Sequence, residues 1–314
     1  MKKLFLITLS LFFISQAFSQ TQLTQYFLDG SIYNPAYVGS KDALSTNVFG
    51  RQQWLGFTDA ANNNVTPFSV VFNMHAPLYS INSGVGINVV SDNLGFEKNL
   101  GVKLNYAYKF LMNNEKGRMG VGLGVSLLNK TIDFSQLIVE QPGDPLLRVN
   151  QSESGMAPNF DLGLYYQYGT TFDIGLSGTN LLESTIKIGN VNYTQKRNLY
   201  LTSSYQITLI DSREPLYLIP SVLVKSNFIN AQVDLNARVE YNNLVWGGIS
   251  YRYQDAVALI AGVNLNGFRI GASYDITIGN LSGASKGSVE LFVGYDIKID
   301  PGVRSTNNFN TRYL

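Results

Sequence analysis

From Ala43 to about Ile297 the chain alternates between apolar and polar or small residues, in stretches of about ten residues, the length of a tilted spanning strand. One such stretch runs from Ala231 to Tyr241. Its odd-numbered positions are all apolar, and its even-numbered positions are Gln232, Asp234, Asn236, Arg238 and Glu240. Because a strand points successive side chains to opposite faces, one face suits lipid and the other suits water. This is typical of a membrane-spanning β-barrel.

A half-buried strand of a soluble β-sandwich alternates in the same way, so the periodicity alone leaves two folds open. The amino terminus favours export to the cell envelope. An apolar run over 4–14 follows two lysines, and Ala17 and Ser19 supply the small residues that signal peptidase requires before a mature start at Gln20. We expect residues 1–19 to be a secretory signal peptide and exclude them from the fold.

The composition also favours a barrel. Charged residues make up 14% of the chain, below the ~25% of soluble domains, and there are 29 Gly, 19 Tyr and 18 Phe residues. A lipid-facing surface is uncharged, a lumen tolerates glycine, and membrane interfaces favour aromatic side chains. The absence of cysteine excludes a lipoprotein anchor, a disulfide framework and a thiolate metal site. The net charge of +1 gives no indication of nucleic acid as a partner.

The sequence therefore predicts an all-β fold, a single transmembrane antiparallel β-barrel of about fourteen strands. No stretch after the signal peptide approaches the ~20 apolar residues of a spanning helix. The expected strands cover 43–56, 67–76, 83–91, 99–110, 118–128, 159–168, 171–180, 197–209, 216–226, 230–241, 244–253, 256–265, 268–277 and 288–297. The expected domains are the signal peptide (1–19), a non-alternating N-terminal segment (20–42), the barrel (43–297) and a polar C-terminal tail (298–314).

Connection lengths test this count, because bacterial barrels have short periplasmic turns and longer extracellular loops. Turns after even-numbered strands are tight, and Asn266-Gly267 is a strong hairpin signal. Connections after odd-numbered strands are longer, as around 61–64, 129–158 and 181–196. Short links near Asn227 and Asp255 are the exceptions, where the register could be displaced by one hairpin. This parity predicts an outer-membrane barrel of a Gram-negative cell with both termini on the periplasmic side. The loop at 141–145 then faces outside the cell, and its length suggests a function.

The residues just before the first expected strand do not alternate. The segment 25–40 combines aromatic residues with an Asn34-Pro35 step and a following Gly39, which indicates turns held by ring packing. Two interpretations of this segment stay open. It is either a plug or clamp at the periplasmic end of the barrel, or part of a docking surface for a partner.

Three short blocks closely resemble the opening of the PorP/SprF family of type IX secretion system outer-membrane proteins. They are Gln25-Tyr26, then Asn34-Pro35-Ala36-Tyr37-x-Gly39, then Arg51-x-Gln53-Trp54-x-Gly56. The overall plan is also similar, with His75-Ala76-Pro77-Leu78 ending the second strand before Gly-rich alternating strands. The chain departs from the pattern at Val38, where Ala is expected, and in its polar tail after the last strand.

The resemblance implies a Bacteroidota outer-membrane barrel that serves protein secretion and surface anchoring. It implies three kinds of partner: outer-membrane lipid, a secreted cargo protein or its C-terminal domain, and periplasmic type IX secretion components. In some members the cargo is an adhesin for gliding motility. The candidate partner-docking residues are those of the motif: Gln25, Tyr26, Asn34, Pro35, Ala36, Tyr37, Gly39, Arg51 and Trp54.

No catalytic, cofactor or metal site is expected, and the chain is predicted not to be an enzyme. The only histidine, His75, shares a strand face with Ser69, too far away along one extended strand for a Ser–His pair, although a serine on a neighbouring strand stays open. The glycines at 120, 122 and 124 recur with a period of two, so they are strand glycines rather than a phosphate-binding loop.

Charged residues of both signs fall on the predicted lumen face. The expected charge network is Asp234, Arg238, Glu240, Arg252, Arg269 and Asp275, and further lumen-facing positions are Lys103, Lys109, Asp161, Glu290 and Asp296. Mixed signs favour a filled lumen over an ion-selective channel. Cross-strand salt bridges that hold the register are the simplest role for the network. A passive porin or small-molecule transporter is the alternative function.

Overall fold

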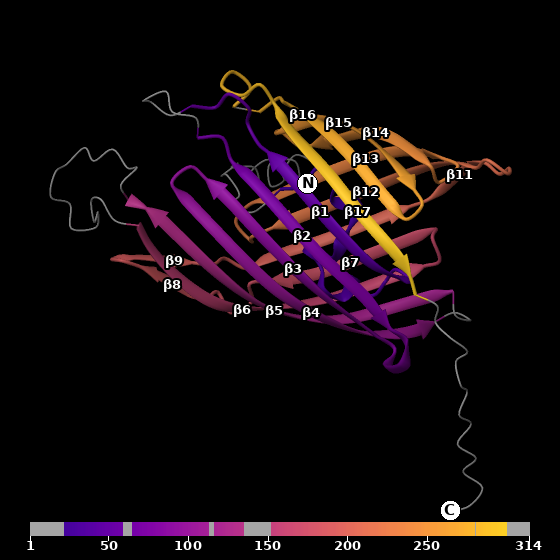
Figure 1. Cartoon of the computed structure of the whole chain (residues 1–314), viewed down its shortest axis with the longest axis horizontal. Coiled ribbons are helices and arrows are strands. Elements are labelled where there is room, and N and C mark those ends of the chain that lie inside the picture. Colours follow the sequence, from indigo (N-terminus) through magenta and orange to yellow (C-terminus); the bar gives the residue numbers. More distant parts are fainter. Residues whose placement is uncertain (1–21, 59–64, 113–115, 135–151, 280, 300–314) are drawn as a thin grey trace, which may run out of the picture.

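The computed structural model describes residues 22–58, 65–112, 116–134, 152–279 and 281–299. Within them the chain forms a closed antiparallel β-barrel of 14 strands, as predicted (Figure 1). No helix in these ranges is long and apolar enough to cross a membrane. The expected signal peptide, the loop at 141–145 and most of the polar tail lie outside the described residues.

The barrel strands are β1 (Ala43–Gln52), β2 (Phe68–Leu78), β3 (Ser83–Leu94), β4 (Glu97–Met112), β5 (Gly117–Asp133), β6 (Ser152–Tyr168), β7 (Phe172–Thr179), β10 (Asn198–Tyr205), β12 (Leu216–Ser226), β13 (Ala231–Tyr241), β14 (Val245–Arg252), β15 (Ala256–Leu265), β16 (Phe268–Thr277) and β17 (Ser288–Lys298). Neighbouring strands pair antiparallel, and the ring closes where β1 pairs with β17. A short strand, β11 (Ile207–Ile210), continues β10 along β12.

Each expected strand corresponds to one barrel strand, with β11 covering the end of the expected strand 197–209, because the side-chain alternation that predicts a strand is a local property. Three details differ from the prediction. The first strand ends at Gln52 rather than 56, since Trp54 takes a left-handed φ of 52° and turns the chain. The fifth and sixth strands are longer than expected. The connection over 181–196 also holds an unpredicted hairpin of β8 (Thr185–Ile188) and β9 (Val191–Thr194).

The two faces of the wall differ as the alternation predicts. Leu104 on β4 and Val125 on β5 lie opposite each other and point outward, with 61% and 60% of their surface exposed. The next pair in the register, Asn105 and Gly124, points into the barrel, and Asn105 is buried there. A continuous exposed surface of large apolar side chains needs lipid around it. The alternation therefore separates a lipid-facing exterior from a polar lumen.

The strands end at two rims. The connections after β1, β3, β5, β7, β12, β14 and β16 lie at one rim, here called the long-loop end. The other rim, the short-turn end, holds the remaining turns, and β1 begins and β17 ends there, with Ala43 paired to Lys298. The short links near Asn227 and Asp255 are true hairpins at the long-loop end, because the strands that flank them pair with each other. The register is not displaced.

β5 and β6 project beyond the ring at the long-loop end, and the β8–β9 hairpin packs against them (Figure 1). Ile186 and Ile188 of the hairpin are fully buried against Ile132, Phe134 and Ala157. This small core lies above the barrel and gives the projection a packed interior of its own. The long-loop end therefore carries a structured platform on one side.

Candidate functional site in the barrel lumen

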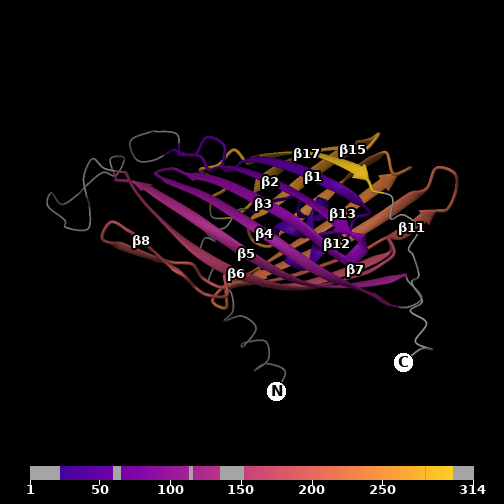
Figure 2. The ribbon, with the colours of Figure 1, turned by 60° about the horizontal axis from the view of Figure 1, so that its bottom comes forward.

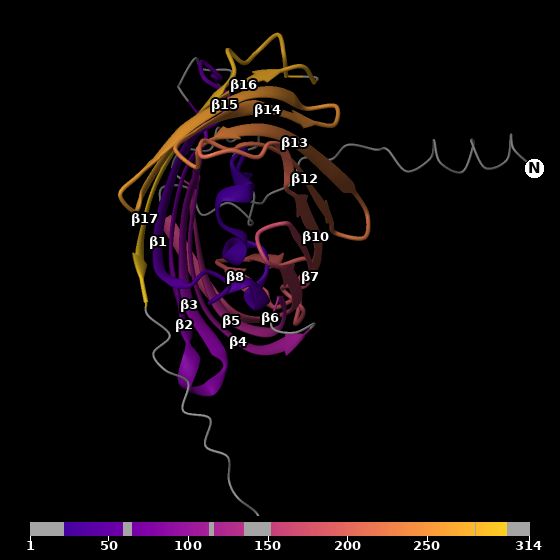
Figure 3. The ribbon, with the colours of Figure 1, turned by 90° about the vertical axis from the view of Figure 1, so that its right-hand side faces the viewer.

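The residues that precede β1 lie inside the barrel. Figure 3 shows this N-terminal segment, coloured indigo, within the ring of strands. It forms three single turns of 3-10 helix, η1 (Tyr26–Leu28), η2 (Gly30–Ile32) and η3 (Pro35–Tyr37). Gln25, Asp29 and Ala36 have no exposed surface. The segment fills the lumen with its own side chains and backbone.

The segment runs through the lumen from one rim to the other. Gln22 donates to Gln232, the second residue of β13, at the long-loop end, over 2.6 Å. Gly39 packs against Gly84 near the start of β3, at the short-turn end. The position of both termini on the periplasmic side stays a prediction, because residues 1–21 and 300–314 lie outside the described residues. Gln22 and the last residues of β17 lie at opposite ends, because the chain traverses the lumen before β1 begins.

Local sequence explains the turns of the segment. The Asp29 side chain accepts from the Ser31 N–H at 2.8 Å and so caps η2. The Asn34 side chain accepts from the Ala36 N–H at 2.9 Å and caps η3, whose first residue is Pro35. Asp and Asn accept from backbone N–H groups two residues on, and proline suits the first position of a helical turn. These local contacts turn the chain within the segment.

Glycines in the wall let the segment approach closely. A Cβ at Gly122 of β5 would lie 2.2 Å from the Ala36 nitrogen, and one at Gly84 of β3 would lie 2.2 Å from the Val38 carbonyl oxygen. Gly39 also needs to be glycine, because its φ is +70°. The glycine alternation in the strands therefore makes room for the backbone of the segment.

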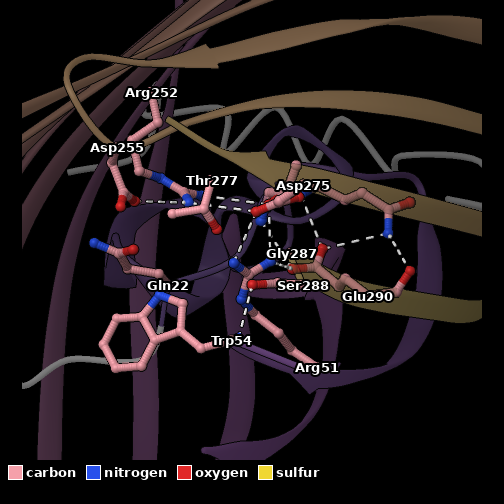
Figure 4. A network of polar contacts seen from close by, with 12 residues as sticks. Gln22, Arg51, Trp54, Arg252, Asp255, Asp275, Thr277, Gly287, Ser288 and Glu290 are labelled. Carbon is pink, nitrogen blue, oxygen red and sulfur yellow. Dashed lines mark hydrogen bonds and ion pairs between the residues drawn. The ribbon is translucent and has the colours of Figure 1, made fainter. Parts of the chain in front are cut away.

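A buried ionic cluster holds the segment at the long-loop end (Figure 4). Arg51 of β1 lies between Asp275 of β16, at 2.8 Å, and Glu290 of β17, at 3.2 Å, and no side chain of the three is more than 1% exposed. Glu290 also accepts from the backbone N–H groups of Thr24 and Gln25, at 2.8 and 2.9 Å. A buried charge is tolerated when it is paired and its hydrogen bonds are satisfied, and the segment supplies part of that satisfaction.

A second arginine extends this cluster. Arg252 of β14 contacts Asp275 at 3.4 Å, Asp234 of β13 at 3.3 Å and Asp255 at 3.2 Å. Asp234 and Arg252 are direct partners in the register, so this pair also joins two neighbouring strands. The Thr24 hydroxyl donates to Asp275, which ties the segment to the same carboxylate.

The middle of the segment is held by Asp29. Its carboxylate lies 3.2 Å from the His75 Nε2 atom and accepts from the Asn47 side chain at 2.6 Å. The other ring nitrogen of His75 accepts from the Gly39 N–H at 3.4 Å. The same carboxylate caps η2, so Asp29 joins the segment to both β1 and β2.

Contacts with the N-terminal segment hold the His75 ring in place. Both of its ring nitrogens face groups of the N-terminal segment. Ser45 lies opposite His75 in the register of β1 and β2, but its hydroxyl accepts from Arg269 at 3.1 Å and from Asn47 at 3.3 Å. The ring is thus engaged as a hydrogen-bonding partner of the segment.

Side chains of the wall bind the backbone carbonyls of the segment. Lys103 donates to the Ile32 oxygen at 2.9 Å, and Lys109 donates to the Ala36 oxygen at 2.6 Å. Two further contacts are Arg269 to the Leu28 oxygen at 3.2 Å and Ser177 to the Tyr33 oxygen at 2.7 Å. Because buried carbonyls need donors, these wall residues make the filled lumen possible.

Aromatic side chains complete the packing. The Phe27 ring meets the Trp246 ring edge-on at 5.7 Å, and the Arg238 guanidinium lies 4.6 Å from the centre of the Phe27 ring. Tyr33 packs against Tyr200 of β10 at 5.3 Å. Rings that pack in this way fix the orientation of the segment in addition to filling volume.

The structure separates the predicted charge network into three groups. Arg252, Asp234 and Asp275 belong to the buried cluster of the long-loop end. Arg238 pairs with Glu240 at 3.8 Å. Arg269 pairs with Asp296 at 2.8 Å. The network was expected to join strands to one another, and it also binds the N-terminal segment.

The residues of the family motif lie in or beside this lumen site. Gln25, Tyr26, Asn34, Pro35, Ala36, Gly39 and Arg51 are buried, and Tyr37 and Trp54 are half-buried. In this conformation the motif residues hold the segment inside the barrel, and their role in docking a partner stays a prediction. Sequence analysis missed Thr24, Asp29 and the role of Glu290. The signal for Asp29 was its position as the one acidic residue between Thr21 and Lys41.

In the part of the chain that the structure describes, no group of three or more His, Cys, Asp or Glu side chains could hold a metal ion. The carboxylates that gather in the lumen are already paired with arginines. The site therefore has the chemistry of a binding interface between the segment and the wall.

Comparisons with known proteins identify a family. The family described as type IX secretion system membrane protein PorP/SprF matches residues 15–295. No curated protein sequence matches the chain. Solved structures with a similar fold include the toluene transporter TbuX of Ralstonia pickettii, at 10% identity and a TM-score of 0.50, covering 86% of this chain and 93% of that one. The toluene transporter TodX of Pseudomonas putida has 9% identity and a TM-score of 0.47, covering 85% and 93%. At this identity the likeness is one of fold alone.

Proposed function

The chain belongs to the PorP/SprF family of type IX secretion system membrane proteins, and on this basis we propose that it is a non-enzymatic platform that binds partner proteins at its rims. It is an outer-membrane β-barrel. In this proposal it supports the secretion and surface anchoring of a cargo protein, adhesin-like and recognised through its C-terminal domain. Periplasmic components of the same secretion system are its other partners.

The filled lumen is the observation that carries this proposal. The N-terminal segment occupies the barrel from one rim to the other and is bound by the wall along its length. A passive porin needs a continuous aqueous path through the lumen. With that path occupied, the rims and the outer surface are the parts of the barrel available for partners.

We propose that the short-turn end faces the periplasm and the long-loop end faces outside the cell. Short periplasmic turns and longer extracellular loops are the rule in bacterial barrels. In this orientation the platform made by β5, β6 and the β8–β9 hairpin is on the cargo side. The short-turn rim is then on the side of the periplasmic machine.

Deletion of the gene tests the proposal. One secreted cargo protein is expected to be retained in the cell or released into the medium, while other secreted proteins are unaffected. Complementation with the full chain should restore surface display. Unchanged localisation of every type IX cargo would overturn the proposal.

The porin alternative is tested with the purified barrel in planar lipid bilayers. The filled lumen predicts no stable ionic conductance. Stable conductance of the full chain would contradict the platform proposal in its present form and would favour a transporter. When the barrel is instead purified from native outer membranes, a cargo protein or a periplasmic component of the secretion system should co-purify with it.

A further inference from the structure

One stretch of the barrel wall has an edge with no neighbouring strand. β10 pairs with β7 as far as Tyr205, opposite Phe172, and the Gln206 N–H donates to the Thr171 oxygen at 2.7 Å. Beyond Gln206 the chain continues as β11, which pairs only with β12. In the described part of the chain, the other edge of β11 therefore faces no strand.

This edge lies outside the lipid-facing band. Tyr205 and Phe172 have their rings 6.4 Å apart, and both they and Tyr241 of β13 belong to the outward aromatic residues near the short-turn end. Such aromatic residues mark the interface between hydrocarbon and water. β11 follows Tyr205 in the chain, so it lies beyond that interface. Figures 1 and 2 show the hairpin of β11 and β12 projecting beyond neighbouring strands.

All four side chains of β11 are exposed, and three of them are apolar. Ile207, Leu209 and Ile210 have 39%, 51% and 52% of their surface exposed. Neither a charged residue nor a proline interrupts the strand, although these are the usual means by which a protein protects an exposed edge from pairing. The charged residues begin only in the turn that follows, at Asp211.

The long-loop end offers a contrast. β6 pairs with β7 from Leu162 to Tyr168, so among the described residues its first part, including Pro158, pairs with no strand on that side. Proline lacks the N–H that a pairing strand would need, and Ser152 and Ser154 are polar and exposed. The free edge of β6 is therefore protected, whereas that of β11 is not.

We propose that β11 is a docking edge that receives an extended, apolar strand of a partner protein at the short-turn rim. An unpaired strand edge is complementary to another extended backbone, and strand addition satisfies its N–H and C=O groups. The inference rests on the proposed function, in which this rim faces periplasmic components of the secretion system. It specifies the element of the barrel that binds and the extended conformation of the segment that is bound.

A second copy of this chain does not fit as the occupant. Copies inserted the same way in a membrane are related by rotation about the membrane normal, and barrel strands tilt by about 35–45° from that direction. Such a rotation leaves the direction in which each strand runs along the normal unchanged. The β11 strands of two copies would therefore cross at an angle rather than pair antiparallel.

Hydrogen–deuterium exchange of the full chain tests this inference. The amides of Thr208, Leu209 and Ile210 are compared in native outer-membrane vesicles and in liposomes of phosphatidylethanolamine and phosphatidylglycerol that contain only the purified barrel. A paired amide exchanges through opening of the pair, so we expect exchange at least about tenfold slower in the native vesicles. Equal protection in the liposomes would overturn the inference, since lipid or a second copy would then cover the edge. Fast exchange in both preparations would also overturn it.

Two variants of Thr208 show whether the backbone is what binds. Thr208→Pro removes an N–H from β11 and is expected to abolish the protection of its neighbours in native vesicles. The matched control, Thr208→Val, keeps the N–H and should keep the protection. Heat-dependent migration on gels shows whether each barrel is folded, and Leu209→Lys replaces the proline variant if that one is not.

The results separate this inference from the proposed function. Loss of cargo display on gene deletion together with an unprotected edge would refute this inference alone. A protected edge with normal cargo display would refute the proposed function alone.

Discussion

Arg51 and Glu290 are direct partners in the pairing of β1 with β17, and Asp275 lies on the next strand. Their ionic contacts are buried in the lumen, where charges cost several kcal/mol each unless they are paired. The carboxylates of Glu290 and Asp275 also bind the N-terminal segment. At the scale of single residues, the same charged groups therefore stabilise both the register of the wall and the position of the segment.

Replacing Arg51 with Met should strongly destabilise the barrel. The change leaves two carboxylates buried without their shared partner, and breaking a buried pair in this way costs about 3–5 kcal/mol. Urea unfolding followed by tryptophan fluorescence measures the effect. The control is Arg118→Met, whose partner Asp42 is exposed, with an expected loss of about 0–1 kcal/mol. Similar losses in the two variants would contradict the role assigned to the cluster.

Asp29→Ala should destabilise the middle of the segment. The Asp29 carboxylate accepts from Asn47 of β1 and from the Ser31 N–H, so the change leaves buried donors without this acceptor, at a cost of about 1–3 kcal/mol. Urea unfolding at neutral pH, followed by tryptophan fluorescence, measures the loss. Asp211→Ala, in an exposed turn, is the control and should change the stability by less than about 0.5 kcal/mol.

At the scale of elements, the N-terminal segment and the glycine-rich face of β5 depend on each other. η3 lies against Gly122, and the backbone of η3 occupies the space that a side chain at position 122 would fill. Strand glycine usually weakens a sheet, and one accepted reason for it is the close approach of another backbone. The pattern of glycines along β5 thus follows from what the barrel contains.

Gly122→Ala should displace η3 without unfolding the barrel. The added Cβ would lie 2.2 Å from the Ala36 nitrogen, so the segment has to move, at a cost of about 1–3 kcal/mol. We expect faster proteolysis of the segment and the appearance of ionic conductance in planar bilayers. Gly101→Ala of β4 is the control, because its nearest neighbour would be the Leu128 Cδ1 atom at 3.8 Å. If both variants stay closed and protected, the segment is not held by this contact.

At the scale of the whole molecule, the barrel is a ring with two different rims. The long-loop end carries the β5–β6 projection with its small core, and the short-turn end carries the exposed β11 edge. The lumen between them is occupied along its length. This arrangement suits a protein that binds different partners on the two sides of a membrane.

Single cysteines test the proposed orientation, and the natural chain contains none that would interfere. Ser282→Cys lies in the exposed connection between β16 and β17 at the long-loop end, and Ser80→Cys lies in the exposed turn after β2 at the short-turn end. A membrane-impermeant maleimide should label the first in intact cells and the second only after lysis. The reverse pattern would invert the orientation.

The sequence by itself determined the strands of the barrel, their number and which face of each meets lipid. These follow from a period of two in side-chain polarity, which is local and needs no knowledge of what lies across the ring. Turn signals such as Asn266-Gly267 located the hairpins for the same reason. Turn residues at Asn34 and Pro35 likewise indicated that the segment before β1 is compact but not where it lies.

Only the tertiary structure decided that this segment fills the lumen and that the motif residues are buried in it. Arg51 is 224 residues from Asp275 and 239 residues from Glu290 along the chain, and the three meet because the sheet closes on itself. No local pattern encodes which lumen charges face one another, or that Gly122 admits the backbone at Ala36, since both depend on the curvature of the ring and on the path of the segment. The local sequence sets the alternation of side chains, whereas the contacts inside the lumen form only when the sheet closes into a barrel.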